Sequence, residues 1–366
     1  MPTLKLTNEA LIISVREVEK AGGNVSRAAR ALGIGRCTLI HRMKQAVERE
    51  LVDIKAIGKA KDFEFPAELP DGEQPIEQLL EARRDTWRRK QRRAKAVELI
   101  PIKITLPGPI GIAHFGDLHL DDDGTNFALL EQHTKLIVET EGMFAGCVGD
   151  LQNSWIGRLA YLYADQSTTA REAWALIEWW IGWIAPKLIY LIEGNHDSWA
   201  HGVNRVSPLS WILARGQQDS LHMHGARFEL RLPAGKSITL NARHDFQGSS
   251  QWNPAHGVSK AAQLGMHDDI LCAGHRHISG YAPVKDPRTG LISHAIRIAS
   301  YKQIDDYVQK NNFPDQNIFE CPITIIDPDE PDPRYRVSVF FNPVLGAKVL
   351  TVLRQEWGEK HGKKVG

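Results

Sequence analysis

The 366-residue sequence has few cysteines and no hydrophobic run long enough to cross a bilayer. Its four cysteines lack Cys-x-x-Cys spacing and no amino-terminal signal sequence is visible, so we expect a protein of the reducing cytoplasm. The most apolar segment, residues 173–185, is too short for a membrane span, is interrupted by Glu178 and is followed by Pro186. We therefore expect a buried helix there and no membrane partner.

The chain also lacks a strong net charge of either sign. Its 45 Lys and Arg residues nearly balance 44 Asp and Glu residues, and a formal charge of +1 excludes no class of partner. The distribution is uneven, because residues 1–100 carry a net charge of +5 and the remainder carries −4. The length allows two or three domains, so a basic amino-terminal module is separated from a more acidic one.

Five short motifs contain residue types that bind divalent cations. Apolar runs rich in β-formers precede three of them, over residues 109–116, 143–149 and 187–193, and each run predicts a buried strand. The segments 125–140 and 168–185 are long enough for crossover helices, which favours a parallel β-α-β core. Ligands at the carboxyl ends of such strands converge on one crevice. The motifs are Asp117-Leu118-His119, Gly149-Asp150, Gly194-Asn195-His196-Asp197, His244 and Gly274-His275-Arg276-His277.

In this order the motifs resemble the dinuclear metal centre of the calcineurin-like metallophosphoesterases. The resemblance implies an α/β fold, a two-sheet α/β/β/α sandwich, with two divalent metal ions held by hard oxygens and neutral imidazoles. Manganese is the metal expected from the nuclease-type branch, with iron, zinc and nickel as alternatives. Carried over to this sequence, the ligands of one metal are Asp117, His119 and His277, those of the other are Asn195, His244 and His275, and Asp150 bridges the two.

His244 is the ligand with the least support from the sequence, because it lies in residues 241–246 without a sharp motif around it. A histidine in an apolar context is more often a core residue than a ligand. The alternatives to His244 are His222, His224, His256, His267 and His294.

The resemblance further implies metal-assisted hydrolysis of a phosphate ester without a covalent protein intermediate. His196 would stand beside the leaving group as a proton donor or charge stabiliser, Asp150 would be the second catalytic residue, and Asp197 would order the site. Protein phosphatases of this family carry a carboxylate where this chain has Asn153, whereas Gly-Asn-His-Asp is more similar to the phosphodiesterase and nuclease branches. Arg276 is either a contact to a substrate phosphate or a solvated side chain.

The second informative segment, Gly23–Lys44, closely resembles the Fis-type helix-turn-helix. Residues 33–35 predict a sharp turn into a recognition helix over 36–44, on which Leu39 and Met43 recur at helical spacing and should face inward. A helix-turn-helix that reads DNA usually works as a dimer, so we expect a homodimer; a small domain that docks protein is the alternative. The side chains left to meet a major groove are Arg36, Thr38, His41, Arg42 and Lys44.

A dense basic run lies between the two modules. Residues 83–95 hold eight Lys or Arg residues and one Asp, and they follow an acidic stretch near residues 62–81. Such a run is usually a solvated face, but at helical spacing it can also follow a phosphate backbone. Because it follows a helix-turn-helix, we favour contact with nucleic acid, most simply DNA. The candidate contacts are Arg88, Arg89, Arg92 and Arg93.

The same signals predict the domain organisation. After the last motif, residues 291–300, 321–326 and 336–341 predict strands that should complete a second sheet. The predicted parts are a helix-turn-helix domain over 1–60, an acidic then basic helical linker over 61–105, a metallophosphoesterase domain over 106–345 and a frayed tail over 346–366.

Three functions from different classes follow from this organisation. The favoured one is a DNA-directed nuclease or phosphodiesterase, because a DNA reader raises the effective substrate concentration at the metals. The second is a phosphodiesterase or phosphatase for small nucleotides whose DNA-binding domain regulates or localises it. The third is a DNA-binding regulator with a vestigial metal site, and the complete set of seven ligands argues against it.

Overall fold

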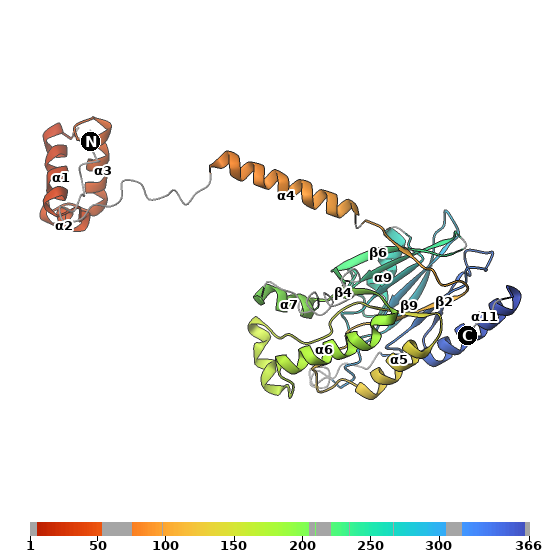
Figure 1. Ribbon diagram of the computed structural model, residues 1–366. Coiled ribbons are helices and arrows are strands. Elements are labelled where there is room, and N and C mark those ends of the chain that lie inside the picture. Colours follow the sequence, from red (N-terminus) through yellow and green to blue (C-terminus); the bar gives the residue numbers. More distant parts are fainter. Residues whose placement is uncertain are drawn as a thin grey trace. The chain divides into compact units, whose positions relative to one another are not determined.

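The computed structural model describes residues 6–52, 75–96, 98–204, 209, 221–233, 235–265, 267–304 and 317–362. The chain forms two compact units, Met1–Trp87 and Arg88–Gly366. The elements (Figure 1) are α1 (Asn8–Lys20), α2 (Val25–Ala31), α3 (Arg36–Glu48), α4 (Ile76–Ala96), β1 (Ile100–Lys103), β2 (Ile110–Phe115), α5 (Phe127–Glu139), β3 (Met143–Cys147), η2 (Gly157–Asp165), α6 (Ala170–Ile184), η3 (Ala185–Lys187), β4 (Leu188–Glu193), α7 (Asn195–Asn204), β5 (Leu221–Met223), β6 (Gly225–Arg231), β7 (Ser237–Arg243), α9 (His256–Leu264), β8 (Ile270–Ala273), β9 (Gly280–Lys285), β10 (Ile292–Arg297), β11 (Ile323–Ile326), β12 (Val337–Phe340) and α11 (Pro343–Lys360).

The first unit contains the predicted helix-turn-helix. The Asn24 side chain accepts a hydrogen bond from the backbone N–H of Arg27 at 3.0 Å and so caps α2. Gly33 has a φ of 63°, a left-handed conformation that suits glycine and turns the chain into α3. Leu39 is fully buried and packs with Ala28 of α2, as its helical spacing predicts.

The first sheet of the second unit has the order β12-β11-β2-β3-β4-β5. Strands β2 to β5 are parallel, as the crossover segments predict, and α5 and α6 form the crossovers. The prediction that residues 321–326 and 336–341 complete the second sheet was wrong, because β11 pairs antiparallel with β2 and β12 pairs with β11. The hydrophobic pattern fixes a strand but not its partner, and Ile323 packs in the same core as Ala113 of β2.

The second sheet has the order β1-β6-β7-β8-β10-β9, and β10 lies in it as predicted. Strand β1 falls inside the stretch predicted as linker over 61–105, so the linker prediction was too long at its carboxyl end. Ile100 and Ile102 alternate with exposed residues, and β1 pairs in parallel with β6. Of that stretch, residues 61–74 lie outside the described part of the chain.

The two sheets and their helices form four layers. Ile110 and Ile112 of β2 face the apolar core between the sheets, whereas Ala113 and Phe115 face the core under α5, α6 and α11. On the far side, Val258 of α9 packs against the second sheet. Figure 1 shows this arrangement in the second unit. The predicted two-sheet sandwich, preceded by a small helical domain, is confirmed.

The carboxyl-terminal segment corrects the predicted frayed tail over 346–366. Residues 343–360 form α11, which Asn342 caps by accepting hydrogen bonds from two backbone N–H groups. Leu350 is fully buried in the core next to the first sheet, so apolar packing orders the helix. Residues 363–366 lie outside the described part of the chain. Among the described helices, including α6, none is long and apolar enough to cross a membrane.

Candidate metal centre

The predicted ligands converge because each follows the carboxyl end of a strand. Asp117 follows β2, Asp150 follows β3, Asn195 follows β4, His244 follows β7 and His275 follows β8. The carboxyl ends of these five strands, from both sheets, meet at one edge of the sandwich. Asp117 and His275, which are 158 positions apart in the sequence, are therefore in direct contact.

The first cluster contains Asp117, His119 and His277, whose nearest donor atoms all lie within 4.8 Å of one another. Nε2 of His119 is 3.0 Å from Nε2 of His277. Oδ2 of Asp117 accepts a hydrogen bond from the backbone N–H of His275 at 2.6 Å, but its buried Oδ1 has no hydrogen-bond partner among the described residues. A buried carboxylate oxygen beside two converging imidazoles fits a divalent cation, which would satisfy all of them.

The second cluster contains Asp150, His244 and His275. Nδ1 of His244 donates to the backbone carbonyl of Val148 at 2.8 Å, which directs Nε2 toward the cluster. That Nε2 lies 3.1 Å from Oδ2 of Asp150, 2.9 Å from Oδ1 of Asn195 and 3.1 Å from Nδ1 of His275. The structure therefore brings His244, the ligand with the least sequence support, into the cluster.

The alternatives to His244 lie elsewhere. His224 is exposed and His294 bonds to the Tyr281 hydroxyl at 2.8 Å. His256 and His267 belong to none of the described groups of potential metal ligands, and the side chain of His222 lies outside what the structure describes.

Burial and charge set the protonation of these groups. Burial raises the pKa of Asp117 well above its usual range. Burial lowers the pKa of His119 well below its usual range, and the neighbouring His277 lowers it further. Burial also lowers the pKa of His244, but the Asp150 carboxylate, the Asp117 carboxylate and the Val148 carbonyl together outweigh this effect and raise that pKa to about 10. His119 is thus held neutral, the form in which an imidazole binds a metal ion.

The backbone at the site is strained. Non-glycine residues rarely adopt positive φ, and such conformations persist only where the surrounding structure enforces them. Five of the seven predicted ligands adopt it here: Asp117 (49°), His119 (43°), Asp150 (54°), His275 (71°) and His277 (52°). The concentration of strain at these positions is typical of a functional site.

Two glycines allow the carboxylates to sit where they do. A Cβ at Gly274 would overlap Oδ2 of Asp117, and a Cβ at Gly194 would overlap Oδ1 of Asp150. The glycines of the Gly-Asn-His-Asp and Gly-His-Arg-His motifs are therefore required by close approach to the carboxylates.

His196 faces both clusters from the start of α7. Its backbone N–H donates to Oδ1 of Asp150 at 2.9 Å, and its ring Nε2 is 4.0 Å from Oδ2 of the same residue. Its Nδ1 donates to the backbone carbonyl of Asn153, while the Asn153 side chain bonds to Nδ1 of His119 at 2.8 Å. The sequence left the partner of His196 open, and no side-chain pattern could have revealed a backbone carbonyl.

Asp197 organises the loops that carry the ligands. Its carboxylate accepts hydrogen bonds from the backbone N–H groups of Asp150, Gly194 and Leu151 at 2.8, 3.0 and 3.1 Å. Burial raises the pKa of Asp197 to about 7, and these donors oppose the shift. Asp197 thus connects the ends of β3 and β4, an arrangement consistent with the ordering role predicted for it.

Arg276 is exposed and makes an ion pair. Its guanidinium lies 3.6 Å from Oδ2 of Asp245. Asp245 also pairs at 3.0 Å with Arg297, a fully buried arginine that donates to the carbonyl of Gly274 at 2.6 Å. Sequence reasoning missed Arg297; its one signal was a charged residue within an apolar run that predicts a strand.

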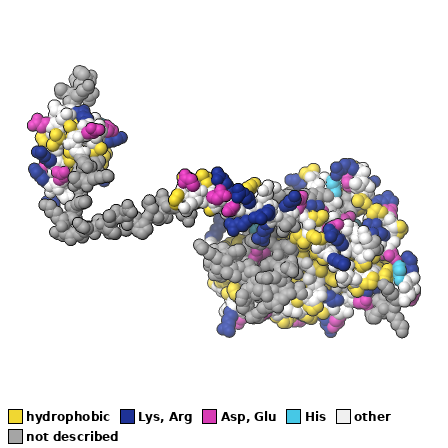
Figure 2. All heavy atoms as spheres, turned by 45° about the horizontal axis from the view of Figure 1, so that its top comes forward, with side chains coloured by type: hydrophobic (Ala, Val, Ile, Leu, Met, Phe, Trp, Pro, Cys, Tyr) yellow, Lys and Arg dark blue, Asp and Glu magenta, His cyan; other side chains and the backbone are white. Residues whose placement is uncertain are grey.

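The residues predicted to contact DNA lie mostly at the surface of their helices. On α3, the side chains of Arg36, Thr38, His41 and Lys44 are exposed and that of Arg42 is half-buried. On α4, Arg88, Arg89, Arg92 and Arg93 are all exposed, and Figure 2 shows Lys and Arg side chains gathered along the carboxyl-terminal part of this helix.

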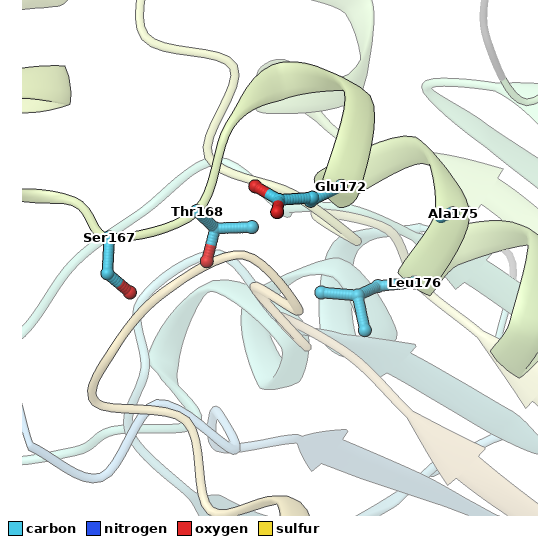
Figure 3. Close-up of a pocket in the computed structure, with 5 residues that line it drawn as sticks. All are labelled: Ser167, Thr168, Glu172, Ala175 and Leu176. Carbon is cyan, nitrogen blue, oxygen red and sulfur yellow. The ribbon is translucent and has the colours of Figure 1, made fainter.

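A hollow of about 470 Å³ beside α6 contains none of the predicted site residues (Figure 3). Ser167, Thr168, Glu172, Ala175 and Leu176 line it. Glu172 and Thr169 form the capping box of α6, with the Glu172 carboxylate accepting from the Thr169 backbone N–H at 2.8 Å. Thr169 and Glu172 therefore stabilise the first turn of α6.

One family model and several solved structures are similar to parts of this chain. Residues 18–45 match the model described as "Bacterial regulatory protein, Fis family", and no curated protein matches the chain. A solved single mutant of Vps29 from Entamoeba histolytica is 11% identical, and the match covers 63% of this chain and 97% of that chain with a TM-score of 0.32. Vacuolar Protein Sorting 29 from Cryptosporidium parvum is 12% identical, with 64% of this chain and 98% of that chain covered and a TM-score of 0.33. The calcineurin-like phosphoesterase YfkN from Bacillus subtilis is 12% identical, with 69% of this chain and 97% of that chain covered and a TM-score of 0.34.

Proposed function

We propose that this protein is a dinuclear metal-dependent phosphodiesterase directed to DNA by its helix-turn-helix. The observation that carries the proposal is the convergence of seven oxygen and imidazole ligand side chains on one strained and largely buried site. Two divalent ions, with Mn²⁺ as the expected metal, would be held by these residues and would supply Lewis-acid activation of water and of the phosphate.

The chain's own residues supply orientation and proton transfer. The Asn153 carbonyl fixes Nδ1 of His196 as a donor, so Nε2 is the ring atom directed toward the site. When His196 is protonated, Nε2 can give its proton to a departing alkoxide oxygen. Asp197 holds the loops of the second and third motifs in place for this step, and Arg297 holds the loop of the last motif.

The test is hydrolysis of single- and double-stranded DNA with Mn²⁺, with bis(p-nitrophenyl) phosphate assayed in parallel. His196→Ala and Asp150→Ala should abolish hydrolysis of DNA and leave DNA affinity intact, because neither residue lies in the helix-turn-helix unit. His361→Ala, which replaces an exposed histidine at the carboxyl-terminal cap of α11, is the matched control. DNA cleavage that survives His196→Ala would reject the assigned site.

Delivery to DNA has its own test in the salt dependence of binding. Each phosphate contact that is removed should lower the slope of log affinity against log salt by about one. Arg36→Ala and Lys44→Ala on α3 should each weaken DNA binding and reduce this slope, whereas Arg16→Ala, exposed on α1, should change neither. Equal effects of all three variants would contradict α3 as the DNA-contacting helix.

A small-nucleotide phosphodiesterase is the second candidate, and a cavity beside the first ligand cluster favours it. Turnover of the small diester without any cleavage of DNA would support this function, and the amino-terminal unit would then serve localisation or regulation.

A further inference from the structure

A cavity of about 460 Å³ opens beside the first ligand cluster. His119, Asn153, His196 and His277 line it on the side of the metal centre. Another part of the wall comes from Trp155 and η2, a segment between β3 and α6 that the proposed reaction does not otherwise use. The volume lies within the range of sites for small organic ligands.

The wall from η2 is apolar and aromatic. Leu159, Tyr161 and Leu162 line the cavity. None of the residues of η2 is buried, and Tyr161 is 68% exposed. Core packing therefore does not explain the aromatic side chain at this position. The Trp155 ring meets the His196 ring edge to face, with centroids 5.2 Å apart, so an aromatic surface runs from the metal centre into the cavity.

Gln166 holds this wall in place. Its Oε1 accepts from the Trp155 indole N–H and the Asn153 amide, both at 3.1 Å. Its Nε2 donates to Oδ2 of Asp121 at 3.1 Å and to the carbonyl of Thr168 at 2.9 Å. Because all the hydrogen-bonding capacity of the Gln166 side chain is used, Trp155 is positioned before any ligand binds, which lowers the entropic cost of binding.

The charge of the cavity selects against a second phosphate. Asp122, Asp123 and Asp165 line it with Lys302, whose ammonium lies 3.0 Å from Oδ2 of Asp122. The excess of carboxylates repels a continuing phosphodiester chain and can accept hydrogen bonds from sugar hydroxyls or base N–H groups. The cavity therefore suits an uncharged aromatic group attached to the phosphate at the metal centre.

We propose that this cavity binds one nucleoside of the substrate, next to the phosphate that is cleaved, with the base against Tyr161 and Trp155. The proposal rests on the proposed function and narrows its substrate class to strand ends and small nucleotide esters. Phosphates in the middle of a strand would place a further phosphate against the carboxylates.

The experiment compares the full chain loaded with Mn²⁺ on two chromogenic esters, thymidine 5′-(p-nitrophenyl phosphate) and bis(p-nitrophenyl) phosphate. Tyr161→Ala should lower kcat/KM for the thymidine ester about 5- to 150-fold more than for the other ester, the range expected for one base-stacking side chain. Tyr335→Ala, which removes a tyrosine of similar exposure (61%) outside the cavity, should leave the ratio of kcat/KM for the two esters unchanged. Titration calorimetry with thymidine 5′-monophosphate and inorganic phosphate gives a second readout that needs no turnover.

The outcomes separate this inference from the proposed function. Turnover of both esters with a ratio unaffected by Tyr161→Ala would overturn the nucleoside site and leave the phosphodiesterase function standing. If neither ester is hydrolysed, but the monophosphate binds more tightly than inorganic phosphate and this preference falls in Tyr161→Ala, the nucleoside site stands and the proposed function fails. Equal affinity for the monophosphate and inorganic phosphate in the unaltered protein would also overturn the nucleoside site.

Discussion

Removing the Asp197 carboxylate should destabilise the second unit more than almost any other single change at the site. The carboxylate is fully buried, and it accepts the backbone N–H groups of Asp150 and Gly194 through Oδ2 and that of Leu151 through Oδ1. Asp197→Ala removes all three acceptors, whereas Asp197→Asn can keep its carbonyl oxygen toward the first two donors and lose only the third.

The magnitude follows from the number of donors left without a partner. A buried donor without a partner costs about 1–3 kcal/mol, so the free energy of unfolding should fall by about 3–9 kcal/mol in Asp197→Ala. The same accounting gives about 1–3 kcal/mol for Asp197→Asn. Because native proteins are stable by only about 5–15 kcal/mol, the alanine variant should be at the edge of folding and the asparagine variant should fold.

Guanidinium unfolding followed by tryptophan fluorescence is the assay, because nine of the ten Trp residues lie in the second unit. The measurement is made with EDTA, so that metal binding does not contribute, and at pH 8, above the pKa of about 7 of Asp197. Asp329→Asn is the matched control, since this carboxylate makes a surface pair with Lys360 at 3.4 Å and should cost at most about 1 kcal/mol.

Two results would refute this reasoning. If Asp197→Ala lowers the free energy of unfolding by less than about 1 kcal/mol, the three N–H groups are not buried donors that depend on the carboxylate. If Asp197→Asn is as damaging as Asp197→Ala, the cost comes from the loss of charge and not from the number of acceptors.

Two further predictions concern the close approach of Gly274 to the Asp117 carboxylate and the protonation of the buried His114. Gly274→Ala should weaken Mn²⁺ binding about 10- to 100-fold in calorimetry, because the new Cβ would displace the Asp117 carboxylate. The control is Gly182→Ala, which adds a Cβ in open space on α6 and should leave Mn²⁺ affinity unchanged. Unchanged Mn²⁺ affinity in Gly274→Ala would contradict the assignment of Asp117 as a ligand. Burial lowers the pKa of His114 to about 3, below its unfolded value of 6.5, so its stabilising contribution is complete above pH 6.5 and is lost as the pH falls toward 3. His114→Gln should therefore reduce the dependence of the free energy of unfolding on pH by about 1.4 kcal/mol per pH unit between these values, measured in EDTA, and an unchanged slope would show that His114 titrates normally.

The sequence by itself determined the local elements and the chemistry of the ligands. Apolar runs that end at Asp117, Asp150 and Asn195 predicted three parallel strands, because burial on both faces requires continuous apolar residues and the ligands must follow the strand ends. The helix-turn-helix was equally predictable, because its signals, Gly33 at the turn and Leu39 on the buried face, act within a few residues of one another.

Only the tertiary structure decided which distant groups meet. The pairing of β11 with β2 and the docking of α11 depend on packing between residues about 200 positions apart, which hydrophobic periodicity does not specify. The Asn153 carbonyl became the partner of His196, and buried Arg297 reached the carbonyl of Gly274, because the fold directs a backbone oxygen and a core arginine to those points. The sequence shows which side chains can bind a metal ion. The positive φ angles that orient these side chains persist only because the surrounding two-sheet fold holds the backbone in this conformation.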